Sequence, residues 1–141
     1  MSLTLLPASR SDIPQLVTIY FAAFQNALSL SRFPRTHAVR TWREKLLHDA
    51  FTDDASARIL KIIKDEEIIA YAQWSMPVED AESIAKQDVM PEWPEDGNTE
   101  LCIETFRAMV AARRELMGWR PHFCMHDRFS SYQTSTDLSE K

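Results

Sequence analysis

Residues 58–77, RILKIIKDEEIIAYAQWSMP, decide the fold. The apolar run Ile59 to Ile63 is separated by four charged residues, 64–67, from a second arm, Ile68 to Met76. Two such arms joined by a short polar segment are typical of a β-hairpin. Alternate residues of a strand share a face, and the even positions of the second arm are all apolar, so we expect a helix to pack on them. These positions are Ile68, Ala70, Ala72, Trp74 and Met76.

The residues before the hairpin predict one strand and two helices. Leu3 to Leu6 form a short apolar run, and Ser11 and Asp12 then offer a helix cap, with Pro14 suited to the first turn. The apolar stripe of this first helix consists of Ile13, Leu16, Val17, Tyr20, Phe24 and Leu28. A loop over 29–36 precedes a second stripe, which predicts a helix over about 36–51. That stripe consists of Val39, Trp42, Leu46 and Ala50.

The residues after the hairpin predict an acidic insertion, a third helix and a last strand. The segment 77–98 is acidic and rich in proline, so we expect an insertion or long loop there, with a short helix within it as an alternative. Asn98 or Thr99 would cap the helix and Gly118 would end it. RPHFCM, residues 120–125, begins like a buried strand, and we expect that strand to stop after Met125. The sequence thus predicts a partial α/β domain over 1–127 and a disordered polar tail over 128–141.

Composition excludes several functions. The chain has 141 residues, which suits one domain, and its net charge of -5 argues against a nucleic-acid partner. No apolar run is long enough to span a membrane, and two cysteines provide no disulfide framework, so we expect a cytoplasmic protein. Gly97 and Gly118 are the only glycines, where about ten would be average. The sequence therefore contains no glycine-rich phosphate-binding loop.

Three stretches of the chain resemble the GNAT family of N-acetyltransferases, in particular its fungal-type members. LTLLPASRSDIPQLVTIYFAAF (3–24) resembles the family's first strand and helix, and RILKIIKDEEIIAYAQWSMP (58–77) its second and third strands. FRAMVAARRELMGWRPHFCM (106–125), with WPEDGN (93–98) before it, resembles the helix and the step into strand four. The resemblance implies a GNAT-like α/β fold in the order strand, helix, helix, hairpin, insertion, helix, strand. It also implies acetyl-CoA as co-substrate and an amine as acceptor.

The sequence departs from this family after Met125. The family continues its fourth strand into a Q/R-x-x-G-x-G/A turn, whose backbone amides bind the pyrophosphate of acetyl-CoA at a helix N-terminus. Here HDRFSSYQTSTDLSEK follows, and it contains no glycine. The pattern is that of a truncated acetyltransferase that lacks the cofactor-binding half. We therefore assign no cofactor-binding residue and expect weak acetyl-CoA binding and impaired or absent activity.

Three residues are candidates for the acceptor site by the same resemblance. Tyr71 and Trp74 lie late in the hairpin, where the family lines its acceptor cleft, and Phe33 lies between the first two helices. Each has a purely structural alternative, as a core aromatic or a loop anchor. No catalytic base is assigned, because the glutamates of the acidic insertion are more typical of a solvated loop.

The spacing of His122, Cys124 and His126 raises the question of a metal site, because imidazole and thiolate are zinc ligands. Residues two apart on a strand are separated by about 6.5 Å, too far for three ligands to share one ion with bonds of about 2.0–2.3 Å. The sequence therefore predicts no metal site. Cys102 on the third helix fits a small core residue.

Three functions remain open on the sequence alone. The first is an N-acetyltransferase that acts on an amine of a small molecule or peptide. The second is a non-catalytic remnant or protein-interaction module, in which an exposed last strand pairs with a second copy of the chain to give a homodimer. The third is an unrelated small α/β binding protein.

Overall fold

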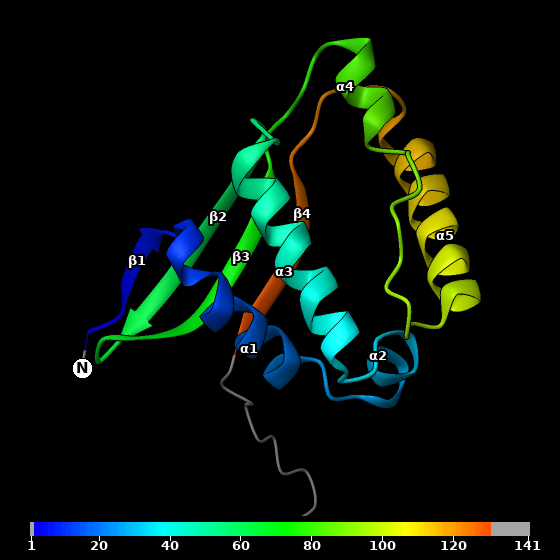
Figure 1. The fold of residues 1–141 in the computed structure, drawn as a ribbon. Coiled ribbons are helices and arrows are strands. Elements are labelled where there is room, and N and C mark those ends of the chain that lie inside the picture. Colours follow the sequence, from blue (N-terminus) through cyan, green and yellow to red (C-terminus); the bar gives the residue numbers. More distant parts are fainter. Residues whose placement is uncertain (1, 131–141) are drawn as a thin grey trace, which may run out of the picture.

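A four-stranded antiparallel sheet forms the centre of the molecule (Figure 1). The structure, a computed structural model, describes residues 2–130, with side chains up to Met125. The strands pair in sequence order, and each lies antiparallel to the next. They are β1 (Thr4–Pro7), β2 (Ala57–Lys64), β3 (Glu67–Ser75) and β4 (Cys124–Ser130). The predicted hairpin is therefore confirmed as β2 and β3.

Within residues 2–130, five α-helices accompany the sheet. Figure 1 shows α1 and α3 in front of the sheet and α5 standing apart, beyond the β4 edge. The helices are α1 (Ile13–Ala23), α2 (Ala27–Arg32), α3 (His37–Thr52), α4 (Ala81–Lys86) and α5 (Thr99–Met117). A 3-10 turn, η1 (Arg10–Asp12), leads into α1. The predicted order of elements is confirmed, and it gives the α/β fold expected from the sequence.

The helix boundaries follow local capping chemistry. The side chain of Asn98 accepts a hydrogen bond from Leu101 N at the start of α5, and Gly118, with φ 59°, ends that helix. Both features confirm the prediction. The segment between the first two helices differs from it, because the side chain of Asn26 caps an additional short helix, α2. The first helix therefore ends at Ala23, and Leu28 belongs to α2.

The core lies between α1, α3 and one face of the sheet. Buried side chains of the two helices pack on Ile59 of β2 and Tyr71 of β3. From the helices they are Ile13, Leu16, Val17, Ile19, Tyr20, Leu47 and Ala50. The buried residues of β3 are thus at odd positions, Tyr71 and Ser75. We predicted that a helix packs on the even-numbered positions of β3, and this was wrong for most of the strand. Trp74, despite its size, lies half-buried on the face away from the helices.

A β-bulge explains the one even residue that does join the core. Ile62 pairs with Ala70 and Ile63 with Ile68, so the register between β2 and β3 passes over Ile69. A bulge places two residues of one strand opposite one residue of the other and shifts the alternation of faces. Ile68 consequently packs against the same core as Tyr71.

A half-buried ion pair fixes the start of α1 on the sheet. Lys61 Nζ of β2 lies 2.7 Å from Asp12 Oδ2, which also accepts a hydrogen bond of 2.8 Å from Ser9 N. Burial opposes ionisation of Asp12, but the hydrogen bonds from Lys61 and Ser9 outweigh it and hold the pKa of Asp12 below its usual range. Asp12 occupies the N-cap position of α1, as predicted, but its carboxylate makes no capping hydrogen bond to that helix and contacts Lys61 and Ser9 N instead.

The last strand is longer than predicted. It continues through Ser130, whereas the sequence predicted an end at Met125 and a tail from residue 128. Backbone pairing with β3 explains the difference, because it does not require an apolar side-chain pattern: Arg128 pairs with Ala72 and Ser130 with Ala70. The remainder of the predicted tail, 131–141, lies outside the described residues.

The predicted insertion 77–98 contains α4, which Asp80 caps by accepting a hydrogen bond from Ser83 N. No helix within residues 2–130 has the length and apolar character that crossing a membrane requires.

The hairpin turn provides a test of local strain. Asp65 and Glu66 form its two-residue loop, with φ of 50° and 67°. This left-handed conformation favours glycine, as in the Asn-Gly turns of natural hairpins. We expect Glu66→Gly to raise the free energy of unfolding by about 1 kcal/mol, measured by chemical denaturation. Glu67→Gly, one residue later in β3, serves as the control and should lower it, and a loss of stability in both variants would contradict the turn assignment.

Candidate functional site

The three predicted acceptor residues lie in three different environments. Phe33 belongs to an aromatic cluster in which its ring stacks on Trp42 at 4.9 Å and lies 6.4 Å from Trp93. Phe106 of α5 packs edge-on against Trp93, with ring centroids 6.1 Å apart. This cluster joins α2, α3 and α5, so Phe33 has the position of a structural anchor.

Tyr71 and Trp74 lie on opposite faces of β3, because they are three residues apart on a strand. Tyr71 is 2% exposed within the core. Trp74 pairs with Arg58 of β2 on one side and Met125 of β4 on the other. The structure therefore does not bring the three predicted residues together, and their role in acceptor binding stays a prediction.

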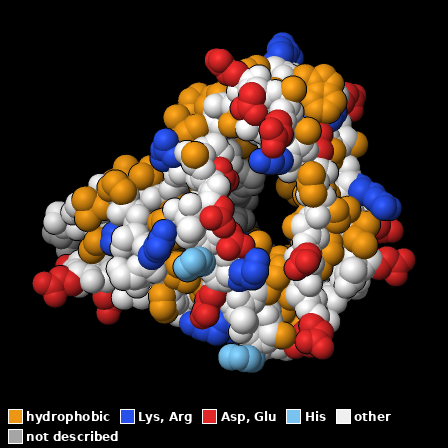
Figure 2. Space-filling model, turned by 45° about the horizontal axis from the view of Figure 1, so that its top comes forward, with side chains coloured by type: hydrophobic (Ala, Val, Ile, Leu, Met, Phe, Trp, Pro, Cys, Tyr) orange, Lys and Arg blue, Asp and Glu red, His pale blue; other side chains and the backbone are white. Residues whose placement is uncertain are grey.

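A cleft of about 970 Å³ lies elsewhere, between α3, the end of β3 and α4. Gln73 and Ser75 line it from the sheet, Arg43 and Leu46 from α3, and Ser83 from α4. Figure 2 shows the molecule hollowed on this face. The volume of the cleft exceeds that of a second pocket, of about 540 Å³, between the end of α1 and the start of α3.

Four carboxylates and three cationic side chains line this cleft. The carboxylates are Asp49, Asp53, Asp54 and Asp80, and the cations are Arg43, Arg58 and Lys86. Two adjacent carboxylates at the end of α3 give that wall an acidic character. Because ionised carboxylates attract ammonium groups, the cleft suits a cationic ligand.

Hydrogen bonds fix several of these charges in place. Asp54 Oδ1 accepts hydrogen bonds from Ser56 N at 2.9 Å and Ser56 Oγ at 2.6 Å. The hydrogen bonds from Ser83 lower the pKa of Asp80, so this carboxyl stays ionised. Arg58 Nη1 donates to the carbonyl oxygens of Ala55 and Ala57 at 2.9 and 2.8 Å.

The buried guanidinium of Arg43 forms the inner wall of the cleft. It lies 4.2 Å from the centroid of the Tyr20 ring, in the geometry of a cation–π contact. Arg43 thereby connects the cleft to the core beneath α1.

Sequence reasoning missed this site because its residues are far apart in the chain. Asp53 and Asp54 look like a polar break between a helix and a strand, and Ser75 looks like a solvent-facing strand residue. The sequence did contain one signal, the pair of adjacent aspartates directly after a predicted helix. This pair indicates a binding site only once α4 is known to lie opposite it.

A cluster of charges ties the segment after α4 to α5. Arg114 Nε and Nη2 donate to the two carboxylate oxygens of Asp88 at 2.7 and 2.8 Å, and Arg113 Nη1 lies 3.5 Å from Asp88 Oδ1. The hydrogen bond from Arg114 holds the pKa of Asp88 below its usual range. We call these three residues the Asp88 clamp. Since Lys86 and Gln87 line the cleft, the clamp positions one of its walls.

Two of the three residues considered for a metal site, His122 and Cys124, make other contacts. His122 Nδ1 lies 2.8 Å from the carbonyl oxygen of Arg120, and Cys124 Sγ lies 4.0 Å from Arg113 Nη2. Among the described residues, no three potential ligands are placed to share one ion. Cys102 is fully buried, as its interpretation as a core residue predicts, and burial raises the pKa of its thiol.

Comparison with solved structures identifies the fold. The chain superimposes with a TM-score of 0.51 and 20% identity on a Corynebacterium glutamicum protein described as histone acetyltransferase HPA2 and related acetyltransferase. The match covers 92% of this chain but 61% of that one. The fold is therefore GNAT-like, and the chain spans about three fifths of the length of this structural relative. No family model and no curated protein matches the sequence.

Two further structures resemble the chain more distantly. The C-terminal condensation domain of Ebony, solved in complex with beta-alanyl-dopamine, has a TM-score of 0.48 and 16% identity over 83% of this chain and 52% of its own. A ribosomal-protein-alanine N-acetyltransferase from Brucella melitensis biovar Abortus 2308 has a TM-score of 0.37 and 12% identity over 84% and 75%.

The Asp88 clamp provides a pH-dependent test. Because the folded pKa of Asp88 is depressed, its contribution to stability is complete above the unfolded pKa of about 3.9 and is lost as the pH falls through the folded value. Asp88→Asn should lower the free energy of unfolding by about 1–3 kcal/mol at pH 7 and by less at pH 3. The exposed Asp96→Asn is the matched control. Equal losses for both variants at pH 7 in denaturation curves would contradict the clamp.

Proposed function

We propose that the chain provides the acceptor side of an N-acetyltransferase, and that the cleft between α3, β3 and α4 receives the amine to be acetylated. The observation that carries this proposal is the acidic wall at Asp53 and Asp54, within a large cleft of a GNAT-like fold. The acceptor is the primary amine of a small molecule or a peptide, which is protonated and positively charged at neutral pH.

The proposed chemistry is acyl transfer from a thioester. Once the ammonium loses a proton, the nitrogen lone pair attacks the thioester carbonyl of acetyl-CoA, a C–N bond forms and the C–S bond breaks. The nitrogen loses a second proton as the amide forms, and the thiolate of CoA that leaves takes this proton up. We assign Asp53 and Asp54 the role of holding the ammonium before this step, because catalysis in such reactions depends strongly on positioning. No residue is assigned as the general base.

These 141 residues offer fewer features for binding the co-substrate than for binding the acceptor. No glycine follows Gly118, so a glycine turn that presents backbone amides to a pyrophosphate is not among them. We expect a calorimetric titration of the chain with acetyl-CoA to give weak binding or none. A single site with a low-micromolar dissociation constant would contradict this expectation.

The acceptor cleft is tested separately from the co-substrate. In an NMR titration, n-butylamine should shift the amides of residues 53–56 and 73–75, whereas the uncharged n-butanol should not. The double variant Asp53→Asn, Asp54→Asn keeps an accepting oxygen at each position but removes both charges. It should weaken amine binding about tenfold.

The control for this double variant is Glu104→Gln, which removes one negative charge from an exposed position of α5. Equal binding of butylamine and butanol, or an equal effect of the control, would overturn the assignment of the cleft. If the amine binds as expected but acetyl-CoA releases no thiol in its presence, the chain is an amine-binding module rather than an enzyme.

A second candidate function, a protein-interaction module, is favoured by the back of the sheet. Figure 1 shows no described helix behind it, and Leu5 on this face is 64% exposed. β4 is an edge strand of the described sheet, and unpaired edges form intermolecular pairs readily. The partner that we propose is a second copy of the chain, paired along β4.

Sedimentation velocity at increasing protein concentration tests this pairing. The wild-type chain should shift from monomer to dimer, and Met125→Lys should shift the equilibrium toward monomer, because Met125 is 40% exposed on β4 and the variant places a charge on the back face beside the paired edge. Leu28→Lys is the matched control, since Leu28 is 62% exposed on α2, away from that face. A wild-type monomer at all concentrations would exclude the homodimer.

A further inference from the structure

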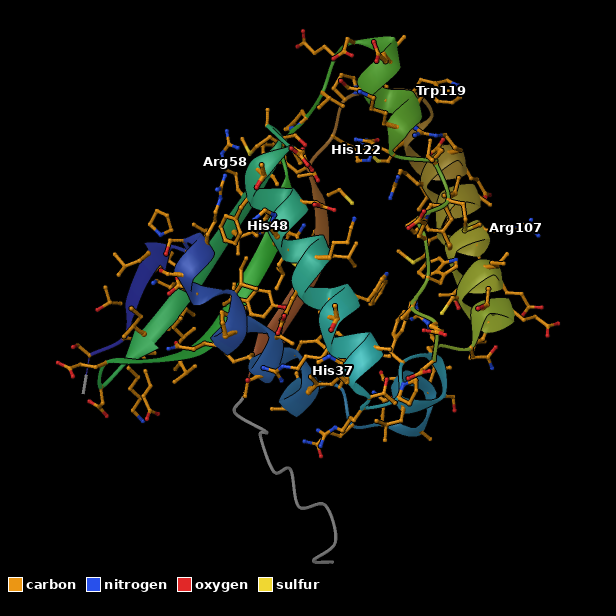
Figure 3. All side chains as sticks on the ribbon, in the orientation of Figure 1. His37, His48, Arg58, Arg107, Trp119 and His122 are labelled. Atoms are coloured by element: carbon orange, nitrogen blue, oxygen red, sulfur yellow. The ribbon has the colours of Figure 1, made fainter. Side chains whose placement is uncertain are left out.

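A second pocket lies between the end of α1 and the start of α3. Its volume is about 540 Å³. Thr18, Phe21 and Gln25 line it from the α1 side, and Arg35, His37 and Arg40 from the α3 side. Figure 3 shows His37 at the beginning of α3, close to the end of α1. The pocket shares no lining residue with the amine cleft.

The charge of this pocket is opposite to that of the whole chain. The chain carries 21 acidic and 16 basic residues, yet two arginines and a histidine line the pocket and no carboxylate does. Glu44 pairs with Arg40 at 3.3 Å from outside the lining and offsets part of this charge. Arg35 keeps its positive charge, so the pocket attracts anions.

The two guanidinium groups are held in place and still have donors available. Arg35 Nη2 donates to the carbonyl oxygen of Phe21, which fixes the side chain on the wall of the pocket. Arg40 Nη2 lies 3.4 Å from Thr18 Oγ1 and 3.5 Å from the carbonyl oxygen of Pro14. Since a guanidinium has five N–H groups, each arginine keeps donors for a ligand.

We propose that this pocket binds the phosphate group of a small phosphomonoester. Two guanidinium forks match the oxygens of a phosphate dianion better than the single charge of a carboxylate. Thr36 and His37 are the N-cap and first residue of α3, so the positive end of that helix adds to the attraction. Phe21 and Ala22 provide an apolar surface for the organic part of the ligand. This site is independent of the proposed amine cleft.

Phenyl phosphate is the probe, because it combines a dianion with an apolar ring. In an NMR titration of the full chain it should shift the amides of Thr18, Ala22, Gln25 and His37. Benzoate, with the same ring and one charge, should bind about tenfold more weakly. The absence of shifts at these amides, or equal binding of benzoate, would overturn the proposal.

Three single variants test the arginines. Arg35→Gln and Arg40→Gln should each weaken phenyl phosphate binding about tenfold, because each removes one charge-assisted contact. Arg107→Gln, at an exposed position of α5 that Figure 3 labels, removes the same charge and should leave binding unchanged. If Arg35→Gln fails to fold because its bond to Phe21 is lost, Arg40→Gln still decides the outcome. An equal loss of phenyl phosphate binding in Arg107→Gln would show that net charge alone causes the effect, and it would overturn the proposed site.

A titration with coenzyme A distinguishes a separate phosphomonoester site from a binding site for the proposed co-substrate. Coenzyme A carries a phosphomonoester of its own, so the same titration is repeated with it. If coenzyme A shifts these amides more strongly than phenyl phosphate does, the pocket belongs to the co-substrate, and a separate phosphomonoester site is excluded.

Discussion

The packing of α1 across one face of the sheet is the constraint on which the other features depend. Leu16 and Val17 are buried against the sheet, and the Asp12–Lys61 ion pair fixes the N-terminus of α1. With α1 in place, α3 can cover the rest of the same face only by lying alongside it. Both pockets follow from this arrangement, because one lies between the two helices and the other lies where α3 passes the end of the sheet.

The sequence predicted the features that depend on neighbouring residues. The hairpin of residues 58–77, the caps of α5 and its end at Gly118 each follow from a short pattern and are confirmed. Contacts between distant residues escaped prediction. The apolar even positions of β3 did not reveal that Tyr71 and Ser75 are buried, because burial depends on which face α1 covers. Asp12, which reads as a cap, has its role defined by Lys61 in another strand.

The same limit applies to the candidate sites. An aromatic side chain such as Phe33 is informative only when its neighbours are known, and here Trp42 stacks on it. The cleft and the second pocket both take charged side chains from α3 or from the residues beside its two ends: Asp49, Asp53 and Asp54 line the cleft, and Arg35, His37 and Arg40 line the second pocket. One helix thus presents an acidic end to one pocket and a basic beginning to the other. A basic beginning and an acidic end both oppose the helix macrodipole, which favours an anion at the first turn and a cation at the last, so each end of α3 suits a ligand of the opposite charge.

The attachment of α5 has a consequence for the behaviour of the molecule in different salt concentrations. Arg114 binds Asp88, donates to the carbonyl oxygen of Gly118 and lies 4.2 Å from the Trp119 ring, so charge contacts hold one end of this helix. Dissolved ions screen partly exposed charges over about 8 Å at physiological ionic strength. Apolar packing against α1 is not weakened in this way. Concentrated salt should therefore loosen the wall of the cleft at Lys86 and Gln87, which the Asp88 clamp positions, while the sheet and α1 keep their arrangement.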